Sequence, residues 1–356
     1  MKSQRNGIEP GALWKDAGLA GATRREFLGL SLLAAAGAVA PGVAVGAGAP
    51  HRSPGVLRGG WQPSRQGLQW TEVRSGVWAA IGGGGNSMLA IEGGQALLVD
   101  TKLATFGPSL ARQARSRAPQ LAMVINTHHH ADHSGGNFAF EAPRLVAHAK
   151  AEPRIRGQWE QYLRQVRGAL SGAALPGEVK EDLERMRERL DELNEVSWAP
   201  KGTVEGDGAE WTLGDGFKIE SRHFGAGHTD NDMVIRLPGQ NVLHAGDLLF
   251  HNLHPFFDPP GGATCEGWIE SVRGAIELCD DETVVIPGHG AVADVEGLKG
   301  QLSYLEKLWD EVGKLVDEGV EREQAAAREW PFMEGLGRPE LRARAIGAVY
   351  DERSKE

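Results

Sequence analysis

The chain has 356 residues, enough for one large domain or two small ones, and its 41% hydrophobic and 24% charged residues are typical of a globular protein. The formal net charge of −10 at pH 7 argues against a general nucleic-acid-binding protein or a protein that binds acidic membranes, because those partners select clustered Lys and Arg. We therefore expect no nucleic-acid partner.

The first segment has the pattern of an export signal. Arg24 and Arg25 precede an apolar, Ala- and Gly-rich run from Leu28 to about Val45. Glycines and a proline interrupt this run, so it is too short and too broken for a membrane-spanning helix. The pattern predicts a twin-arginine signal peptide over residues 1–47, the twin-arginine export machinery as a partner, a periplasmic or secreted location and no stable membrane anchor. The alternative is a hydrophobic N-terminal helix after a chance Arg-Arg pair.

Residues 48–69 are rich in Gly, Pro, Arg and Ser and are predicted to form a linker or N-terminal arm. A folded domain is predicted over residues 70–320, followed by a C-terminal helical tail over residues 321–356. Short apolar runs bounded by turn residues predict strands at 77–81, 87–92, 96–100, 121–126, 210–212, 217–224, 232–237, 241–245 and 283–287. Longer amphipathic runs predict helices at 107–117, between Cys265 and Cys279, and at 295–317. This pattern is typical of an α/β protein in which two sheets face each other with helices outside.

A charged segment over about residues 155–196 has apolar residues at helical spacing. Five of them recur at steps of 4, 3, 4 and 3 and share one helix face: Val179, Leu183, Met186, Leu190 and Leu193. An earlier helix carries Trp159, Leu163, Val166 and Leu170, and residues 171–177 separate the two. The segment is therefore predicted to be a helical-hairpin insert. It either packs on its own domain, forms a homo-oligomer contact or covers the site.

Four potential metal ligands lie within six residues directly after the predicted strand 121–126. They are His128, His130, Asp132 and His133. Imidazole nitrogens and carboxylate oxygens are the ligands that zinc and similar divalent metals accept. A loop can present His128 and His130 on one side and Asp132 and His133 on the other. On this cluster alone, a His-rich surface loop without function is an alternative.

Three further candidates, His228, Asp247 and His289, come later in the chain, each at or just beyond the end of a predicted strand. With them the sequence resembles the metallo-β-lactamase superfamily, whose pattern is His-x-His-x-Asp-His, then His, then Asp or Cys, then His. The resemblance covers about residues 70–300, in order. It implies a four-layer αββα sandwich, to which the helical hairpin is an insert.

The resemblance also implies a site for two metals. It assigns His128, His130 and His228 to the first metal, Asp132, His133 and His289 to the second, and Asp247 to a bridging position. Two dications about 3.5–4 Å apart lower the pKa of a bridging water toward neutrality, so that hydroxide is available as a nucleophile, and they polarise the substrate oxygen. Asp132 and Asp247 are accordingly the predicted catalytic carboxylates.

The aspartate at position 247 is similar to that of glyoxalase II-type hydrolases, whereas many zinc β-lactamases carry Cys or Ser there. A hard bridging carboxylate accepts Fe or Mn as well as Zn, so the predicted cofactor is two Zn²⁺ with Fe or Mn as alternatives. Flavodiiron oxygen reductases of this superfold carry Glu where the chain has His130, which argues against that redox branch.

Substrate contacts are predicted in the segment that follows Asp247. We select His251, His254 and Phe256, because histidines among phenylalanines suit a substrate pocket, although the same side chains would also serve to pack a loop. The four glycines of Gly82–Gly85 predict a mobile loop, either a substrate flap or a loose turn.

The other histidines are assigned supporting roles. His129 is expected to point away from its two neighbours, because adjacent side chains of an extended loop alternate in direction. His148, His223 and His244 lie in apolar, strand-like surroundings, where they either pack or orient a metal ligand through a hydrogen bond.

These features together favour an exported, dinuclear zinc hydrolase that uses a metal-bridging hydroxide on a small acyl-type substrate, namely a thioester, a lactone or a β-lactam. The alternatives are a phosphodiester or sulfate-ester hydrolase, a mononuclear iron dioxygenase, and a metal-binding accessory protein without catalysis. A phosphodiester or sulfate-ester hydrolase needs a positively charged substrate-binding patch. The candidates for this patch are Arg144, Arg154 and Arg156.

Overall fold

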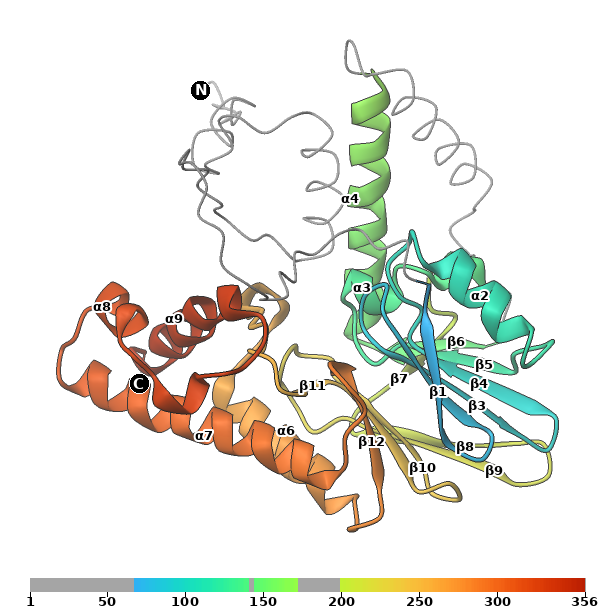
Figure 1. The fold of residues 1–356 in the computed structure, drawn as a ribbon. Coiled ribbons are helices and arrows are strands. Elements are labelled where there is room, and N and C mark those ends of the chain that lie inside the picture. The colour runs from blue at the N-terminus through green and yellow to red at the C-terminus, as the bar shows by residue number, and fades with distance from the viewer. Residues whose placement is uncertain (1–66, 141–143, 172–198, 356) are drawn as a thin grey trace, which may run out of the picture.

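The structure is a computed structural model, and it describes residues 67–140, 144–171 and 199–355. The predicted signal peptide, nearly all of the predicted linker and the second helix of the predicted hairpin lie outside these residues. Figure 1 shows the chain with its elements labelled.

The first sheet has seven strands in the order β1-β2-β3-β4-β5-β6-β7. These strands are β1 (Gln69–Arg74), β2 (Val77–Ile81), β3 (Ser87–Glu92), β4 (Gln95–Val99), β5 (Met123–Ile125), β6 (Leu145–His148) and β7 (Gly202–Val204). Neighbours from β1 to β4 are antiparallel, and those from β4 to β7 are parallel. The carboxyl ends of four adjacent strands therefore meet at one edge.

The second sheet has five strands in the order β12-β11-β10-β9-β8. These are β8 (Gly208–Leu213), β9 (Phe217–Arg222), β10 (Val234–Leu237), β11 (Val242–Phe250) and β12 (Val284–His289). Only the β11–β12 pair is parallel. All nine residues of β11 are buried, as is usual for a strand that is covered on both faces.

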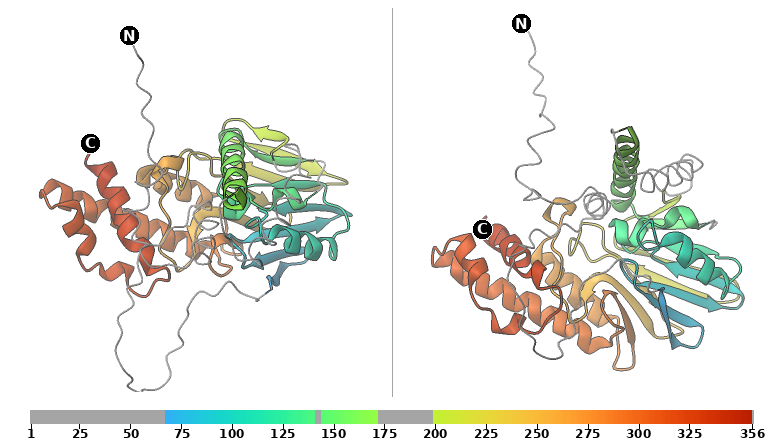
Figure 2. Two further views of the ribbon diagram at one scale, coloured as in Figure 1. Left: turned by 90° about the horizontal axis from the view of Figure 1, so that it is seen from above. Right: turned by 45° about the horizontal axis from the view of Figure 1, so that its top comes forward.

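Helices cover the outer face of each sheet (Figure 1), and Figure 2 shows the same layers from two other directions. The helices are α2 (Gly107–Arg115), α3 (Ala131–Ser134), α4 (Ala151–Ser171), α6 (Cys265–Glu277), α7 (Val295–Asp317), α8 (Arg322–Ala327) and α9 (Arg342–Arg353). One core lies between the two sheets, a second between the first sheet and α2, and a third between the second sheet and α6 to α9. The predicted fold of two facing sheets between helical layers is confirmed.

The base of α4 packs on the domain through Ile155 and Trp159, which are buried, and the rest of the helix extends away from the sheets (Figure 1). At the other end of the molecule, α8 and α9 share one core with α7, with Val312, Ile346 and Val349 fully buried. Within the described ranges, no helix is both long enough and apolar enough to span a bilayer.

Three of the strands were not predicted, and among those that run further than predicted, β11 differs most. The missed strands β1, β6 and β7 are short or, in β1, mostly polar, so they lack a clear alternation of apolar residues. Strand β11 was expected to end at residue 245 but continues to Phe250 beside β12, with a shifted register around Gly246. Because Gly246 adopts φ 53°, the strand continues through this irregularity, and Asp247 lies inside the strand instead of after it.

Candidate metal centre

Five of the seven predicted ligands lie on segments that follow strands, and the other two, Asp247 and His289, lie within β11 and at the end of β12. Three residues after β5, the chain enters the loop that carries His128 and His130, and the short helix α3 then turns Asp132 and His133 toward the other side. His228 lies in the loop after β9, and this loop is fastened because Thr229 donates two hydrogen bonds to the carboxylate of Asp232. Asp247 and His289 lie on the adjacent strands β11 and β12.

The structure brings these side chains into two groups whose ligand atoms lie within 4.8 Å of one another. The first group is His128, His130, His228 and Asp247, and the second is Asp132, His133 and His289. Asp247 connects them: Oδ2 lies 3.2 Å from His228 Nε2 and 3.4 Å from His289 Nε2, and Oδ1 lies 3.0 Å from His133 Nε2. A carboxylate that reaches both groups is placed as a bridging ligand would be.

Three atoms at the centre of the site are buried without a partner. His128 Nε2, His133 Nε2 and Asp247 Oδ1 make no hydrogen bond of acceptable geometry with any described residue, even though the last two atoms are only 3.0 Å apart. Buried polar atoms without partners are rare because each costs free energy. Coordination of a metal ion would satisfy all three atoms, and imidazole with carboxylate is the donor set that zinc accepts.

Four of the five histidines in these groups are held through their second ring nitrogen. His128 Nδ1 lies 3.0 Å from Thr127 Oγ1, His133 Nδ1 donates to Asp100 Oδ2 at 2.7 Å, His228 Nδ1 donates to the Phe256 carbonyl at 2.8 Å, and His130 Nε2 donates to Asp258 Oδ2 at 2.9 Å. These contacts orient each ring and direct the other nitrogen toward the centre of the site.

Burial sets the protonation of two histidines of the first group. It lowers the pKa of His128 well below its usual value and that of His228 to about 3, so both rings are neutral and able to donate a lone pair to a metal. Burial would raise the pKa of Asp247, but the surrounding histidines, His289 and His133 foremost, hold it well below its usual value. The first group is therefore ready to bind a cation.

In the second group, nearby carboxylates favour the protonated form of His133. Burial alone would lower the pKa of His133, but the carboxylates of Asp247, Asp100 and Asp132 raise it well above its usual value. A metal that binds His133 therefore displaces a proton from its ring.

Sequence reasoning missed Asp100 and Asp258, the two carboxylates that orient ligands. Asp100 is fully buried directly after β4, and it accepts hydrogen bonds from Thr127 N, Thr127 Oγ1 and His133 Nδ1. An acidic residue at the carboxyl end of a buried strand was the available signal for Asp100. Asp258 gave no such signal, because it lies in a loop.

Asp100→Asn should weaken binding of the metal at His133 by about 10- to 100-fold, because the amide is uncharged and orients the imidazole less firmly. Zinc titration with a competing chelator measures this change. Asp215→Asn, in the exposed turn between β8 and β9, is the control and should leave both affinities unchanged. Equal affinities in the Asp100 variant and the wild type would contradict this role.

His129 belongs to neither group, but it does not point away from both neighbours as predicted, because its ring centroid lies 6.3 Å from that of His128 and only 4.6 Å from that of His130. Its backbone N–H donates to Asn231 Oδ1 at 3.0 Å, and its ring lies beside the Asn231 amide. Its Nε2 lies 3.8 Å from Asp258 Oδ2, so His129, His130 and Asp258 form a third group of potential ligands. Because Asp258 already accepts the His130 hydrogen bond, we assign it an orienting role.

The three predicted substrate contacts separate in the structure. Phe256 lies at the first group, with its ring centroid 5.9 Å from that of His130 and 6.3 Å from that of His228. His251 is held beside the His289 turn, where its Nδ1 donates to the Ala291 carbonyl at 2.8 Å. His254, predicted to contact substrate, lies elsewhere: the residue is 2% exposed, its Nδ1 lies 3.1 Å from the Tyr304 hydroxyl, and it lines a pocket formed by the C-terminal segment. It packs against the α7–α9 layer and does not join the metal groups.

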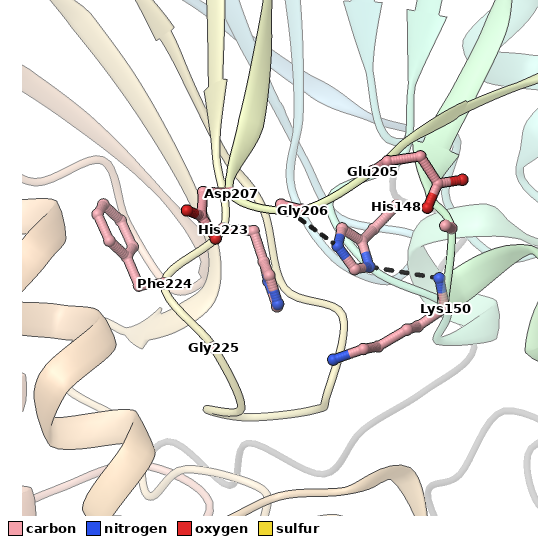
Figure 3. A pocket seen from close by; sticks show the side chains of 9 residues that line it. His148, Lys150, Glu205, Gly206, Asp207, His223, Phe224 and Gly225 are labelled. Atoms are coloured by element: carbon pink, nitrogen blue, oxygen red, sulfur yellow. Dashed lines mark hydrogen bonds between the residues drawn. The ribbon is translucent and has the colours of Figure 1, made fainter.

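His148 and His223 lie together in a separate pocket of about 650 Å³ (Figure 3). Their ring centroids are 4.1 Å apart, and burial lowers the pKa of both. His223 Nδ1 donates to the Asp232 carbonyl, so it supports the loop that carries His228. His244 is buried and lies 3.2 Å from the Asn86 carbonyl. These three histidines pack, and none is a member of the two metal groups.

Two of the three arginines considered for a phosphate-binding patch form ion pairs with carboxylates. Arg154 Nη2 is 2.6 Å from Asp230 Oδ2, and Arg156 pairs with Glu152 one turn earlier on α4. Two of the three charges are thus already compensated, which disfavours a phosphodiester substrate.

Comparisons with known proteins identify a family and a fold. A model of the metallo-beta-lactamase superfamily matches residues 80–289. A metallo-beta-lactamase type 2 of Bacillus cereus is 29% identical over 77 residues, which are 22% of this chain and 30% of that protein. One from Bacillus sp. (strain 170) is 24% identical over 171 residues, 48% of this chain and 52% of that protein, so the chain spans about half or less of either relative. A solved metallo-beta-lactamase from Pontibacter korlensis has a TM-score of 0.51 at 19% identity and is covered over 99% of its length by 67% of this chain.

Proposed function

Because this chain belongs to the metallo-beta-lactamase superfamily, we propose that it is an exported dinuclear zinc hydrolase acting on a small acyl-type substrate: a thioester, a lactone or a β-lactam. The observation that carries the proposal is the convergence of seven ligand side chains into two groups that share Asp247. Iron or manganese would also suit the carboxylate-containing donor set.

The ligand residues would have different roles in this function. His128, His130 and His228 would hold one metal and Asp132, His133 and His289 the other, with Asp247 between them. Bound dications polarise a substrate carbonyl and make water a nucleophile near neutral pH. The Asp132 side chain is 20% exposed, against 3% for Asp247. Burial alone would raise the pKa of Asp132, but His133 and His289 hold it well below its usual value, so this carboxylate stays ionised and able to bind a metal on the more exposed side of the site.

The surroundings support a small substrate with an apolar part. The Phe256 ring stands at the edge of the first group, and Phe250 stacks on His289 at a centroid distance of 5.0 Å. Both aromatic rings lie against ligand histidines, and the exclusion of water there would strengthen electrostatic interactions with a bound metal. We include β-lactams among the candidate substrates because the relatives are metallo-beta-lactamases. Asp247 favours instead a thioester substrate, as in the glyoxalase II-like branch.

Export is proposed on the sequence of residues 1–47. Arg24→Lys together with Arg25→Lys should retain the protein in the cytoplasm of a bacterial host, because the twin arginines are what the translocase recognises. Cell fractionation with an antibody against the chain reads the result. Equal amounts of wild type and double variant in the periplasm would refute export by this route.

The central test is elemental analysis of the purified protein beside hydrolysis assays on a thioester, a lactone, a cephalosporin and a phosphodiester. We expect two zinc ions per chain and metal-dependent hydrolysis of one acyl substrate class. One iron per chain without hydrolysis would replace the proposal with an iron dioxygenase. Two tightly bound metals without turnover on any substrate would indicate a metal-binding accessory protein.

A further inference from the structure

The glycine loop between β2 and β3 is hydrogen-bonded to the segments that carry the metal ligands. The buried Lys102 ammonium donates hydrogen bonds to the carbonyls of Ala80 and Gly85, and Leu103 N donates to Gly83 O. Gly85 N donates to the Asp132 carbonyl at 3.0 Å. Gly85 and Asn86 are both buried at the end of this loop, so they form a fixed element beside the second group of ligands.

Asn86 holds the end of β12, which carries His289. Its side chain is 2% exposed, and its Nδ2 donates to the carbonyls of Pro287 and Gly290, both at 2.9 Å, so the two bonds bracket His289. Its backbone N–H donates to the Gly288 carbonyl at 2.7 Å. One residue thus makes three hydrogen bonds to the segment from Pro287 to Gly290, which spans the end of β12 and begins 201 positions later in the chain.

Gly85 meets the other two ligands of the same group. Besides its bond to the Asp132 carbonyl, it packs directly against the His133 ring. A Cβ atom at Gly85 would lie 2.1 Å from both Cε1 and Nε2 of His133, which no side chain can occupy. Asp132, His133 and His289, the second group, therefore all contact the segment Gly85–Asn86.

His289 depends on this clamp more than the other histidines do. The other four direct their second ring nitrogen to a hydrogen-bond partner, whereas His289 Nδ1 has no such partner among the residues that the structure describes. Its ring is placed by stacking on Phe250 and by the backbone at the end of β12. The amide of Asn86 holds that backbone on both sides of the ligand.

From this arrangement we infer that Asn86 is a positioning residue for the second metal, acting through the backbone around His289. It does not itself touch the metal or substrate. Among the contacts described, no hydrogen bond from Gly85 or Asn86 reaches His128, His130 or His228. Loss of the Asn86 amide should therefore affect the two metals unequally. The inference rests on the two-metal site of the proposed function but not on its substrate.

The test is a stepwise titration of metal-free protein with Co²⁺, whose visible absorption reports each site, and with Zn²⁺ against a chelator. Asn86→Ala should raise the dissociation constant of the second metal by about 10- to 100-fold and leave that of the first unchanged. Asn86→Ser retains one donor and should give an intermediate shift. If the alanine variant does not fold, the affinities of the serine variant test the role of Asn86.

Val312→Ala is the control for general destabilisation, because Val312 is buried in the α7 layer and contacts neither metal group. It should lower the melting temperature without separating the two affinities. Equal weakening of both metals in the Asn86 variants, or no weakening, would overturn the role of Asn86 while leaving a two-metal hydrolase intact. A wild-type chain that binds only one Co²⁺ would overturn both this inference and the dinuclear function.

Discussion

Asp247→Ala should lower hydrolysis of the responsive substrate by about 10²- to 10⁴-fold, because charge stabilisation by a metal pair supplies several kcal/mol and each 1.36 kcal/mol is tenfold in rate. The carboxylate is 3% exposed and its two oxygens face both ligand groups. No other described side chain belongs to a group with His128 while also approaching His133 and His289. Steady-state kinetics with elemental analysis should show both the rate loss and fewer than two metals per chain.

Replacement of a second aspartate, away from the site, controls for the loss of one negative charge. Asp280 lies in the exposed turn before β12, where it is bound by Asn241 and Thr283, away from the ligand groups. Asp280→Ala should keep two metals and the wild-type rate. If Asp247→Ala also keeps both, the bridging role is wrong and the two groups bind their metals independently.

Removal of the metals should lower the melting temperature of the wild type by at least about 10 °C. A ligand at a thousand times its dissociation constant stabilises the folded state by about 4 kcal/mol per site, and a large domain shifts by roughly 2–4 °C per kcal/mol. The physical cause in this chain is that His128 Nε2, His133 Nε2 and Asp247 Oδ1 are buried and without partners unless a metal binds them. Calorimetry before and after chelation, followed by readdition of zinc, measures the shift.

The same measurement on two variants separates metal binding from general stability. Val312→Ala should melt earlier than the wild type in both states, with the same difference between them. Asp247→Ala should show a smaller difference, because it binds less metal. An unchanged melting temperature of the chelated wild type would mean that the ligand groups are stable without metals and would argue against a resident cofactor.

Much of the fold followed from local patterns. Strands such as β2 and β3 alternate or cluster apolar residues between turn residues, and α7 begins at Val295 and ends at Asp317, as its periodicity predicted. The boundary at residue 245 was wrong because burial of β11 on both faces, and its pairing with β12, depend on partners distant in the chain. Local sequence carries no information about such coverage.

The candidate ligands could be named from the sequence because their chemistry and spacing are local: His128 to His133 lie in one loop, and His228, Asp247 and His289 lie at or near strand ends. Their orienting partners could not be named. Asp100 meets His133 across 33 positions, and Asp258 meets His130 across 128. A buried carboxylate is informative only once its neighbour in space is known.

The sequence by itself determined the types and order of the metal-binding side chains, the apolar runs that form the two sheets, and the acidic balance that disfavours nucleic acid. Only the tertiary structure decided that Asp247 reaches both groups, that His254 packs against Tyr304, and that the glycine loop is fastened at Asn86. The physical reason is that hydrogen bonds and coordination act over about 2–3 Å in space, whichever residues the fold brings together.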